Sequence, residues 1–293
     1  MKKGSCCALI TPFTNEGKID HSNLERLLDF HLQEGTDNLC VLGTTAEAAA
    51  MSMQEREEAL KTIVGKVKGK IPILVGTGTI NPDSVKAMTQ QAIDLGADAN
   101  LLVSPYYVKP PQRSMLRHFT NIADMGLPII LYNVPGRTAV DISDESIAIC
   151  AQHENIVGVK DATGDLSRLT SLKKELGDNT DFLLYSGDDG STKDFVLMGG
   201  DGCISVTANL VPRTMREMVH AALDGDEAKA TSLNNPLLQL HKDLFCESNP
   251  IPAKWAASRI GLVETPYCRL PLDQMDPQFE PLVEEALRAA GLI

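Results

Sequence analysis

The chain has little positive charge. Its 293 residues include 27 Lys and Arg against 39 Asp and Glu, which gives a formal net charge of −12 at pH 7 and a pI near 5.0. Proteins bind nucleic acids and anionic membrane surfaces through a basic face. The composition therefore argues against both as partners. An anionic small molecule stays open as a substrate, provided that a local cationic group holds it.

Long apolar runs and metal or disulfide motifs are also missing. The apolar run near the N-terminus stops at Pro12, which is too short for a signal peptide or a membrane span. The seven cysteines form no CxxC pair, and an odd number cannot close a complete disulfide set. Reduced thiols in a cytoplasmic protein fit this pattern. The six histidines lack HExxH spacing, so we expect no metal site.

Short apolar segments instead alternate with longer amphipathic ones. Eight such alternations over roughly 220 residues match the size of a (β/α)8 TIM barrel, an α/β fold. A doubly wound sheet is the alternative, but Gly76-Thr77-Gly78 lacks the third glycine of a dinucleotide-binding fingerprint and follows the third strand. The predicted strands are Cys7–Ile10, Asn38–Leu42, Ile73–Gly76, Ala99–Val103, Ile129–Tyr132, Ile156–Lys160, Phe182–Ser186 and Cys203–Val206.

Helices are predicted between these strands. The clearest follows Ser52, where Glu55 completes a capping-box pattern and apolar residues then recur on one face. Several others open with a serine, which favours a helix cap. The further helices are Ser84–Leu95, Ser114–Met125, Ser143–Gln152, Leu166–Leu176 and Val211–Leu223.

Strand patterns disappear from about Asp224 onward. Helical patterns separated by turns with Pro and Gly continue to the end of the chain. We therefore predict a barrel over residues 1–224 and a C-terminal helical domain over 225–293. The helices of this second part are predicted at Glu227–Phe245, Pro252–Ile260 and Gln278–Ala290.

Lys160 ends the sixth predicted strand. In a parallel barrel, all strands end at one rim, where active sites are built. Apolar surroundings favour the neutral amine, which can attack a carbonyl and form a Schiff base. A solvated loop lysine is the alternative interpretation of this position.

Hydroxyl and charged side chains follow the other predicted strands at the same rim. A tyrosine near the amine can relay protons with a threonine. Threonine hydroxyls and backbone amides suit a carboxylate, and the planar fork of an arginine suits a second one. Each residue alone also fits a cap, a turn or packing, and Asp188 and Asp189 fit a helix cap better than a metal site. The rim set comprises Thr44, Thr45, Tyr106, Tyr107, Tyr132, Arg137 and Lys160.

Six motifs closely resemble the dihydrodipicolinate synthase (4-hydroxy-tetrahydrodipicolinate synthase) family. They occur in the family's order along almost the whole chain. The motifs are Gly-Thr-Thr-x-Glu (43–47), Tyr-Asn-Val-Pro-x-Arg-Thr (132–138), Val-Lys-Asp-Ala-Thr-Gly (159–164), Ser-Gly-Asp-Asp (186–189), Ile-Ser-Val-Thr-Ala-Asn (204–209) and Asn-Pro-Ile-Pro-x-Lys-Trp (249–255).

This resemblance implies a lyase of the class I aldolase type with a (β/α)8 barrel and a C-terminal helical domain. It implies condensation of pyruvate with L-aspartate-4-semialdehyde to 4-hydroxy-tetrahydrodipicolinate, in lysine and diaminopimelate biosynthesis in the cytoplasm. It further implies a homotetramer, built as a dimer of dimers. The covalent intermediate on Lys160 would replace any cofactor, and no metal is implied.

The resemblance also assigns roles to residues of this chain. Lys160 would form the Schiff base, and Tyr132 would relay protons with Thr44 and with Tyr107 of a neighbouring subunit. The substrate-binding roles fall on four other residues. Thr45 would bind the pyruvate carboxylate, Arg137 the carboxylate of the semialdehyde, and Gly187 and Ile204 would line the pocket through their backbones.

Some positions depart from the family's pattern. Ala46, Ala48 and Ala139 stand where glycine, serine and glycine are usual, beside the site. Lysine-inhibited members carry histidine, asparagine and glutamate at a feedback site. Weak or absent inhibition by lysine is therefore implied, because the corresponding residues here are Met53, Arg56, Ile80 and Ser84.

Two other functions compete with this interpretation. Sister pyruvate aldolases, such as N-acetylneuraminate lyase or a keto-deoxy sugar acid aldolase, share the lysine and the Tyr-Asn-x-Pro turn. Their substrates are polyols, and Arg137 suits a second carboxylate instead. A non-catalytic barrel is the other alternative, and the presence of Lys160, Tyr132, Tyr107 and Thr44 together argues against it.

Overall fold

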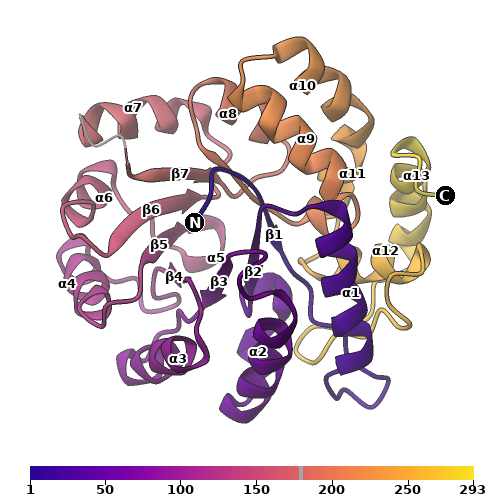
Figure 1. Cartoon of the computed structure of the whole chain (residues 1–293), viewed down its shortest axis with the longest axis horizontal. Helices are drawn as coiled ribbons and strands as arrows, with labels where there is room; N and C mark the ends of the chain where they lie inside the picture. The colour runs from indigo at the N-terminus through magenta and orange to yellow at the C-terminus, as the bar shows by residue number, and fades with distance from the viewer. Residues whose placement is uncertain (178–180) are drawn as a thin grey trace.

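Eight parallel strands close into a barrel in sequence order, with β1 paired to β8 (Figure 1). The computed structural model describes residues 1–177 and 181–293, and eight is the number of barrel strands among these residues. The predicted (β/α)8 barrel is confirmed. The strands are β1 Gly4–Ala8, β2 Asn38–Val41, β3 Ile73–Gly76, β4 Ala99–Val103, β5 Ile129–Asn133, β6 Ile156–Asp161, β7 Leu183–Ser186 and β8 Gly202–Ser205.

Helices surround the barrel and cover the outer faces of its strands (Figure 1). Each crossover from one parallel strand to the next runs through at least one of them, as parallel pairing requires. The outer helices are α1 His21–Glu34, α2 Met53–Val67, α3 Pro82–Leu95, α4 Gln112–Ala123, α6 Asp144–Cys150, α7 Leu166–Leu176, α8 Thr192–Leu197 and α9 Pro212–Leu223.

Most predicted strands agree with the structure to within one residue at each end, but β1 begins three residues earlier and ends two residues earlier than predicted. Gly4 and Ser5 have low strand propensity. They nevertheless pair with Gly202 and Cys203 of β8, and the Gly4 amide donates to the Asp201 carbonyl at 2.9 Å. Closure of the barrel thus outweighs the local preference of these residues.

The capping predictions were partly correct. The Ser52 capping box is present, because the Glu55 amide donates to Ser52 Oγ at 3.2 Å and the Ser52 amide donates to Glu55 Oε2 at 2.9 Å. Helix α3 instead begins at Pro82, with Asn81 as its cap. Proline suits the first helical position because the amide there needs no intrahelical partner. A serine further along the chain is therefore not the start of this helix.

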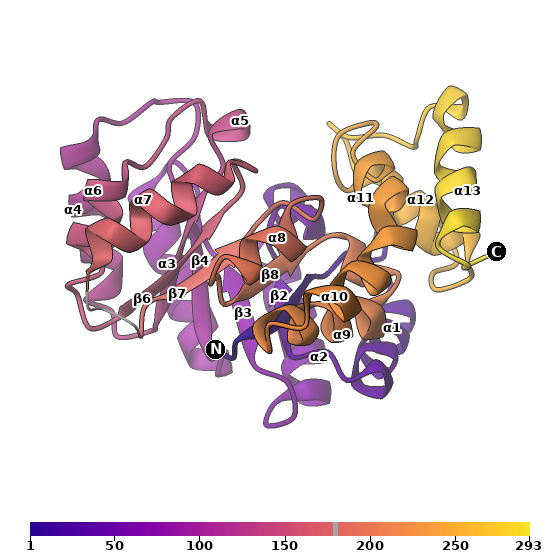
Figure 2. The same ribbon diagram turned by 90° about the horizontal axis from the view of Figure 1, so that it is seen from above.

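Four helices follow the barrel elements, and Figure 2 shows three of them, α11 to α13, at one side of the barrel, while α10 lies along α9. The single helix predicted over Glu227–Phe245 is interrupted by a 3₁₀ turn at Asn235–Leu237. Pro236 in this turn has no amide hydrogen to continue an α-helix. The C-terminal helices are α10 Glu227–Asn234, α11 Leu238–Asp243, α12 Ile251–Arg259 and α13 Glu280–Ala289.

Two buried apolar clusters stabilise the fold. The larger one fills the layer between the strands and the helices. The smaller one fills the barrel interior, because alternate residues of each strand point inward. Tyr132 and Ile204 belong to this interior cluster. The tyrosine therefore stands on the inner face of the barrel, just below the rim.

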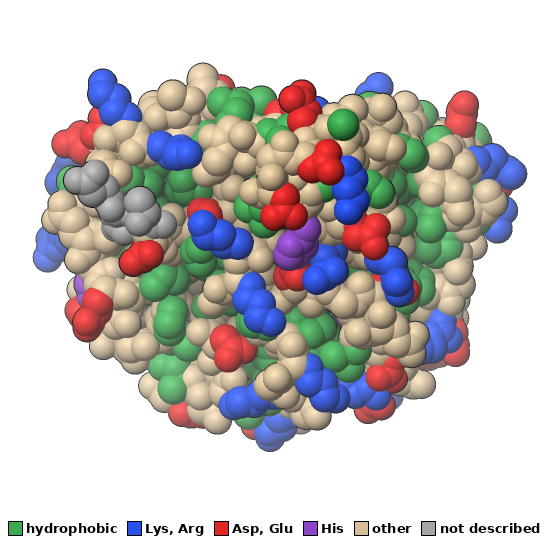
Figure 3. Space-filling model, turned by 45° about the horizontal axis from the view of Figure 1, so that its top comes forward, with side chains coloured by type: hydrophobic (Ala, Val, Ile, Leu, Met, Phe, Trp, Pro, Cys, Tyr) green, Lys and Arg blue, Asp and Glu red, His purple; other side chains and the backbone are tan. Residues whose placement is uncertain are grey.

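The surface gives no sign of charge segregation on the face shown in Figure 3, where acidic and basic side chains are interspersed. Among the residues described, no helix combines the length and the hydrophobicity needed to cross a membrane.

Candidate active site

The amine of Lys160 lies inside the barrel, at the C-terminal ends of the strands. The side chain is buried, with 6% of its surface exposed. Lys160 on β6 pairs in register with Tyr132 on β5, and its Nζ lies 4.4 Å from the centre of the tyrosine ring. A lysine and a phenol therefore share one small space on the inner face of the barrel.

A cavity of about 220 Å3 opens around this amine. Its volume suits a small substrate, since pockets for drug-sized ligands start near 300 Å3. Its walls combine apolar side chains, such as Leu9 and Val206, with a few polar groups. Six predicted site residues line the cavity, namely Thr44, Thr45, Tyr132, Arg137, Lys160 and Gly187.

The two threonines lie on a 3₁₀ turn, Thr44–Ala46, directly after β2. Thr44 is exposed to the cavity side, whereas Thr45 is buried and its Oγ1 accepts a hydrogen bond from Asn249 Nδ2 at 2.9 Å. Asn249 also lines the cavity. Sequence reasoning gave Asn249 no role, although it opens one of the six motifs.

A buried ion pair supports the same turn. Glu47 follows the threonines with a positive φ of 55°, and Lys254 Nζ donates to its Oε1 at 2.7 Å. Both side chains are almost completely buried, and the Arg269 amide donates to the other Glu47 oxygen at 2.7 Å. The Glu47 carboxylate thus accepts hydrogen bonds from two donors in the C-terminal part of the chain. These bonds fix a backbone conformation that L-residues rarely adopt.

Arg137 lies on a short helix, α5 Pro135–Thr138, which follows β5. Its side chain is exposed, and Nη2 makes a long hydrogen bond of 3.4 Å to the Asn249 carbonyl. Within residues 1–177 and 181–293, no carboxylate forms an ion pair with it. The guanidinium therefore offers its charge to an anionic group in the cavity.

Gly187 leaves room for the lysine side chain. A Cβ at this position would lie 2.7 Å from Lys160 Cε and 2.7 Å from Ala162 Cβ. The Gly187 amide donates to the Asp161 carbonyl at 2.6 Å, which holds the glycine against β6. A side chain here would displace the amine.

Two predicted site residues lie outside the cavity lining. Ile204 is 1% exposed and packs in the barrel interior. Tyr107 is 86% exposed and has a φ of 70°, whereas its neighbour Tyr106 donates to or accepts from Thr79 Oγ1 at 3.1 Å. The roles of Ile204 and Tyr107 stay predictions.

The cavity also contains a thiol. Cys40 lines it, and burial raises the pKa of this thiol to about 11, although the charge of Lys160 opposes the shift. Cys40 is therefore a neutral thiol near neutral pH and a poor nucleophile. The amine is the stronger candidate for attack on a carbonyl.

The two aspartates after β7 have different uses. Asp188 Oδ2 accepts from the Ser191 amide at 2.9 Å, close to the start of α8. Asp189 Oδ2 instead accepts from the Val206 and Thr207 amides, both at 2.9 Å. The cap interpretation of Asp189 was therefore wrong, because its side chain joins the β7 loop to the β8 loop. No cluster in the described part of the chain has three or more His, Cys, Asp or Glu placed to hold a metal.

A second cavity of about 620 Å3 adjoins the first and shares Thr44, Tyr132 and Arg137 with it. Met53, Arg56 and Ser84 line this second cavity, whereas Ile80 is not among its lining residues. Arg56 is 4% exposed, and burial lowers its pKa to about 10. A buried cation therefore lies in the wall of the larger space.

Comparisons with known proteins give one consistent result. A model of the dihydrodipicolinate synthetase family matches residues 1–290. The chain is 45% identical over 294 residues to the 4-hydroxy-tetrahydrodipicolinate synthase of Pseudomonas aeruginosa, with 100% of both chains covered.

Solved structures agree with this match. The structure is similar to that of the chloride-inhibited dihydrodipicolinate synthase of Acinetobacter baumannii complexed with pyruvate, with a TM-score of 0.97, 44% identity and 100% of both chains covered. It is also similar to a structure described as the first monomeric dihydrodipicolinate synthase variant, with a TM-score of 0.95, 36% identity and 100% and 98% of the two chains covered.

Proposed function

The chain belongs to the dihydrodipicolinate synthetase family, and we propose that it condenses pyruvate with L-aspartate-4-semialdehyde on Lys160 to give 4-hydroxy-tetrahydrodipicolinate. The observation that carries this function is the buried Lys160 amine beside Tyr132, in a cavity that also contains the threonine turn and Arg137. The covalent bond to Lys160 activates pyruvate, so the reaction requires neither a metal nor an external cofactor.

The first step is formation of the Schiff base. The Lys160 amine attacks the keto carbon of pyruvate after it has given up its proton, and the resulting carbinolamine loses water to give an iminium. Tyr132 supplies and removes protons near the nitrogen, in relay with the Thr44 hydroxyl. Thr45 and the amides of its turn hold the pyruvate carboxylate.

The second step joins the two substrates. Loss of a proton from the pyruvate methyl group gives an enamine, whose carbon attacks the aldehyde carbon of the semialdehyde. The aldehyde oxygen takes up a proton and becomes the 4-hydroxyl. Arg137 binds the carboxylate of this second substrate and orients it. The substrate's own amine then replaces Lys160 at the imine carbon, which closes the ring and frees the enzyme.

Self-association belongs to the same proposal, as a homotetramer formed from two dimers. Apolar side chains are exposed around the second cavity: Met53, at 42%, lines it, and Tyr107 and Leu270, at 86% and 77%, are chain neighbours of lining residues. Exposed apolar surface of this kind favours a protein interface. Tyr107 would then reach the site of a neighbouring subunit. Full activity of a monomer, measured with its mass by light scattering, would contradict this role of Tyr107.

The regulatory expectation also concerns the second cavity. Free lysine has two ammonium groups and one carboxylate, so it is a net cation, and a buried Arg56 in the cavity wall disfavours its binding. We therefore expect lysine to inhibit weakly or not at all. Half-maximal inhibition by submillimolar lysine in an activity assay would refute this expectation. A cytoplasmic location is proposed as well, because the seven cysteines are free thiols and six of them are buried.

Borohydride trapping tests the function directly. The protein is incubated with pyruvate, reduced and examined by mass spectrometry, with Lys160→Arg as the matched control. We expect a reduced pyruvyl group on Lys160 in the wild type and none in the variant. Turnover of aspartate semialdehyde without cleavage of N-acetylneuraminate selects the synthase over a sister aldolase. Absence of the adduct would contradict the proposal.

A further inference from the structure

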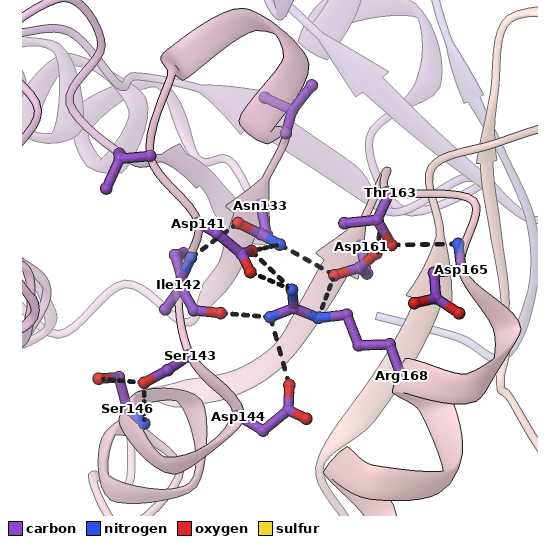
Figure 4. A network of polar contacts seen from close by, with 12 residues as sticks. Asn133, Asp141, Ile142, Ser143, Asp144, Ser146, Asp161, Thr163, Asp165 and Arg168 are labelled. Carbon is purple, nitrogen blue, oxygen red and sulfur yellow. Dashed lines mark hydrogen bonds and ion pairs between the residues drawn. The ribbon is translucent and has the colours of Figure 1, made fainter.

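A cluster of mostly half-buried polar groups lies behind the candidate active site, between the barrel and helix α7. Figure 4 shows the guanidinium of Arg168 at its centre, facing two carboxylates from the stretch 141–144 and one from the end of β6. Arg168 Nη1 donates to both oxygens of Asp141 at 2.6 Å, and Nε and Nη2 form ion pairs with Asp161 at 3.0 Å and Asp144 at 3.2 Å. The Arg168 side chain is only 13% exposed.

The cluster is built from the neighbours of the site residues. Tyr132 and Lys160 are paired on β5 and β6, and the next pair along is Asn133 and Asp161. Successive side chains of a strand point to opposite faces. The first pair therefore faces the cavity, and the second faces the helices. Asn133 Nδ2 donates to Asp161 Oδ2 at 3.0 Å, across these two strands.

The same asparagine reaches the end of the loop that carries Arg137. Asn133 Nδ2 donates to Asp141 Oδ1 at 2.7 Å, and its Oδ1 accepts from the Ile142 amide at 3.0 Å. Arg168 Nη2 donates to the Ile142 carbonyl as well. The end of the loop is thus fixed by one asparagine and one arginine, with Gln112 donating to the Asp141 carbonyl at 2.7 Å.

Arg168 is not equally important to the two strands and to the loop. Asp161 keeps other donors without it, because Asn133 and the Thr163 amide and hydroxyl also bond to this carboxylate. Among the described residues, the Asp141 carboxylate would then retain its bond from Asn133 and no other. Loss of the guanidinium would also leave carboxylates close together without a counter-charge, and their repulsion would displace the more exposed loop end.

Arg137 has few contacts of its own that could compensate. The long bond from Arg137 Nη2 to the Asn249 carbonyl is its one side-chain hydrogen bond among the described residues. The backbone turns at Ala139, with a φ of 58°, between Arg137 and the anchored Asp141. A shift of the loop end is therefore transmitted to Arg137 along a short segment of chain.

We propose that Arg168 is a positioning residue, which places Arg137 for the second substrate by binding Asp141 at the end of its loop. The inference rests on the proposed function, in which Arg137 binds the carboxylate of aspartate semialdehyde. Arg168 contacts neither substrate. Removal of Arg168 disturbs the Arg137 loop and leaves Lys160 and Tyr132 in place. It therefore impairs binding of the second substrate and spares Schiff-base formation with pyruvate.

Arg168→Ala and Arg168→Lys test this role. We measure pyruvate binding by borohydride trapping at graded pyruvate concentrations, and KM and kcat for aspartate semialdehyde by turnover. Because a misplaced binding group costs on the order of 10- to 100-fold, we expect KM for the semialdehyde to rise by that factor in Arg168→Ala. The pyruvate concentration for half-maximal trapping should change by less than about twofold, within the error of additive effects. Arg168→Lys keeps the positive charge but lacks the planar guanidinium, so its KM for the semialdehyde should lie between those of the wild type and Arg168→Ala.

Two further variants make the test specific. Asp141→Asn removes the loop partner, so it should raise the same KM, and the double variant with Arg168→Ala should be no worse than either single variant. Asp144→Asn is the matched control, because it removes a carboxylate of the same guanidinium that belongs to α6. Asp144→Asn should leave the pyruvate concentration for half-maximal trapping and the KM for the semialdehyde unchanged.

Several outcomes would overturn the inference. Equal effects of Arg168→Ala on pyruvate trapping and on semialdehyde KM would indicate general damage to the barrel. Unchanged KM in the Arg168 and Asp141 variants would remove the role altogether. If Arg168→Ala does not fold, as thermal melting would reveal, Arg168→Lys and Asp141→Asn decide the question. Lack of a pyruvate adduct in the wild type would instead contradict the proposed function.

Discussion

At the scale of single residues, the position of the Lys160 amine depends on the space that Gly187 leaves empty. The nearest atoms to a Cβ at Gly187 belong to Lys160 and to Ala162, which follows Lys160 by two residues. The backbone of Gly187 is bonded to Asp161 and cannot move away without loss of that bond. Residue 187 must therefore be a glycine for the Lys160 side chain to keep its position.

Gly187→Ala tests this requirement. The added methyl group must displace Lys160 Cε, so we expect pyruvate trapping and turnover to fall on the order of 100-fold and stability to fall by about 1–3 kcal/mol. Gly190→Ala is the control, because a Cβ there would meet its nearest atom, Asp188 Oδ2, at an ordinary 3.7 Å. Full adduct formation in Gly187→Ala would contradict the steric argument.

At the scale of elements, the strands and most helices could be predicted because their apolar periodicity is local. Most errors occur where a residue distant in sequence determines the bounds of an element or the partner of a side chain. Strand β1 includes Gly4 because β8 pairs with it, and Asp189 bonds to amides after β8 rather than to its own helix. Helix α3 shows a local error, since the Asn81-Pro82 signal was available and a later serine was preferred.

The C-terminal end of α1 contains a group that makes this element sensitive to acid. His31 is completely buried, and its Nδ1 bonds to Thr36 Oγ1 at 2.8 Å. Burial lowers the pKa of His31 to about 4, whereas an unfolded chain binds this proton near pH 6.5. The stability that depends on the neutral histidine is therefore complete above about pH 6.5 and is lost as the pH falls toward 4.

His31→Gln should remove this dependence. From the two pKa values, the wild type should lose about 2 kcal/mol of unfolding free energy between pH 7 and pH 5 through His31. Urea unfolding at both pH values measures the loss in the wild type and in the variant. The variant is expected to lose correspondingly less, and equal losses in both proteins would show that His31 does not titrate as described.

At the scale of the whole molecule, the C-terminal part contributes directly to the rim of the candidate site. Asn249 holds Thr45 across 204 residues of sequence, and Lys254 holds Glu47 across 207. No local pattern could predict these pairs, although the parallel arrangement did predict that strand ends converge. The proposed division into 1–224 and 225–293 therefore separates the two parts along the sequence only. Residues of both parts together form the candidate site.

Lys254→Met tests the energetic side of this connection. It leaves Glu47 as a buried carboxylate without its cation, so we expect a loss of about 3–5 kcal/mol in unfolding free energy. The double variant Glu47→Gln/Lys254→Met removes both charges and should recover much of that loss. Urea unfolding is measured for the wild type, for Lys254→Met and Glu47→Gln alone, and for the double variant. A double variant whose loss equals the sum of the single losses would contradict this account of the pair.

The register of β5 and β6 has a consequence for how the chain can change in length. Tyr132 and Lys160 face one side of these strands, and Asn133 and Asp161 face the other. A single inserted or deleted residue within either strand would exchange its two faces, since side chains alternate with a period of two. Asp161 would then point into the barrel and Lys160 toward α7. Reactive groups and their scaffold are thus interleaved along the same few residues, and length variation is confined to the loops.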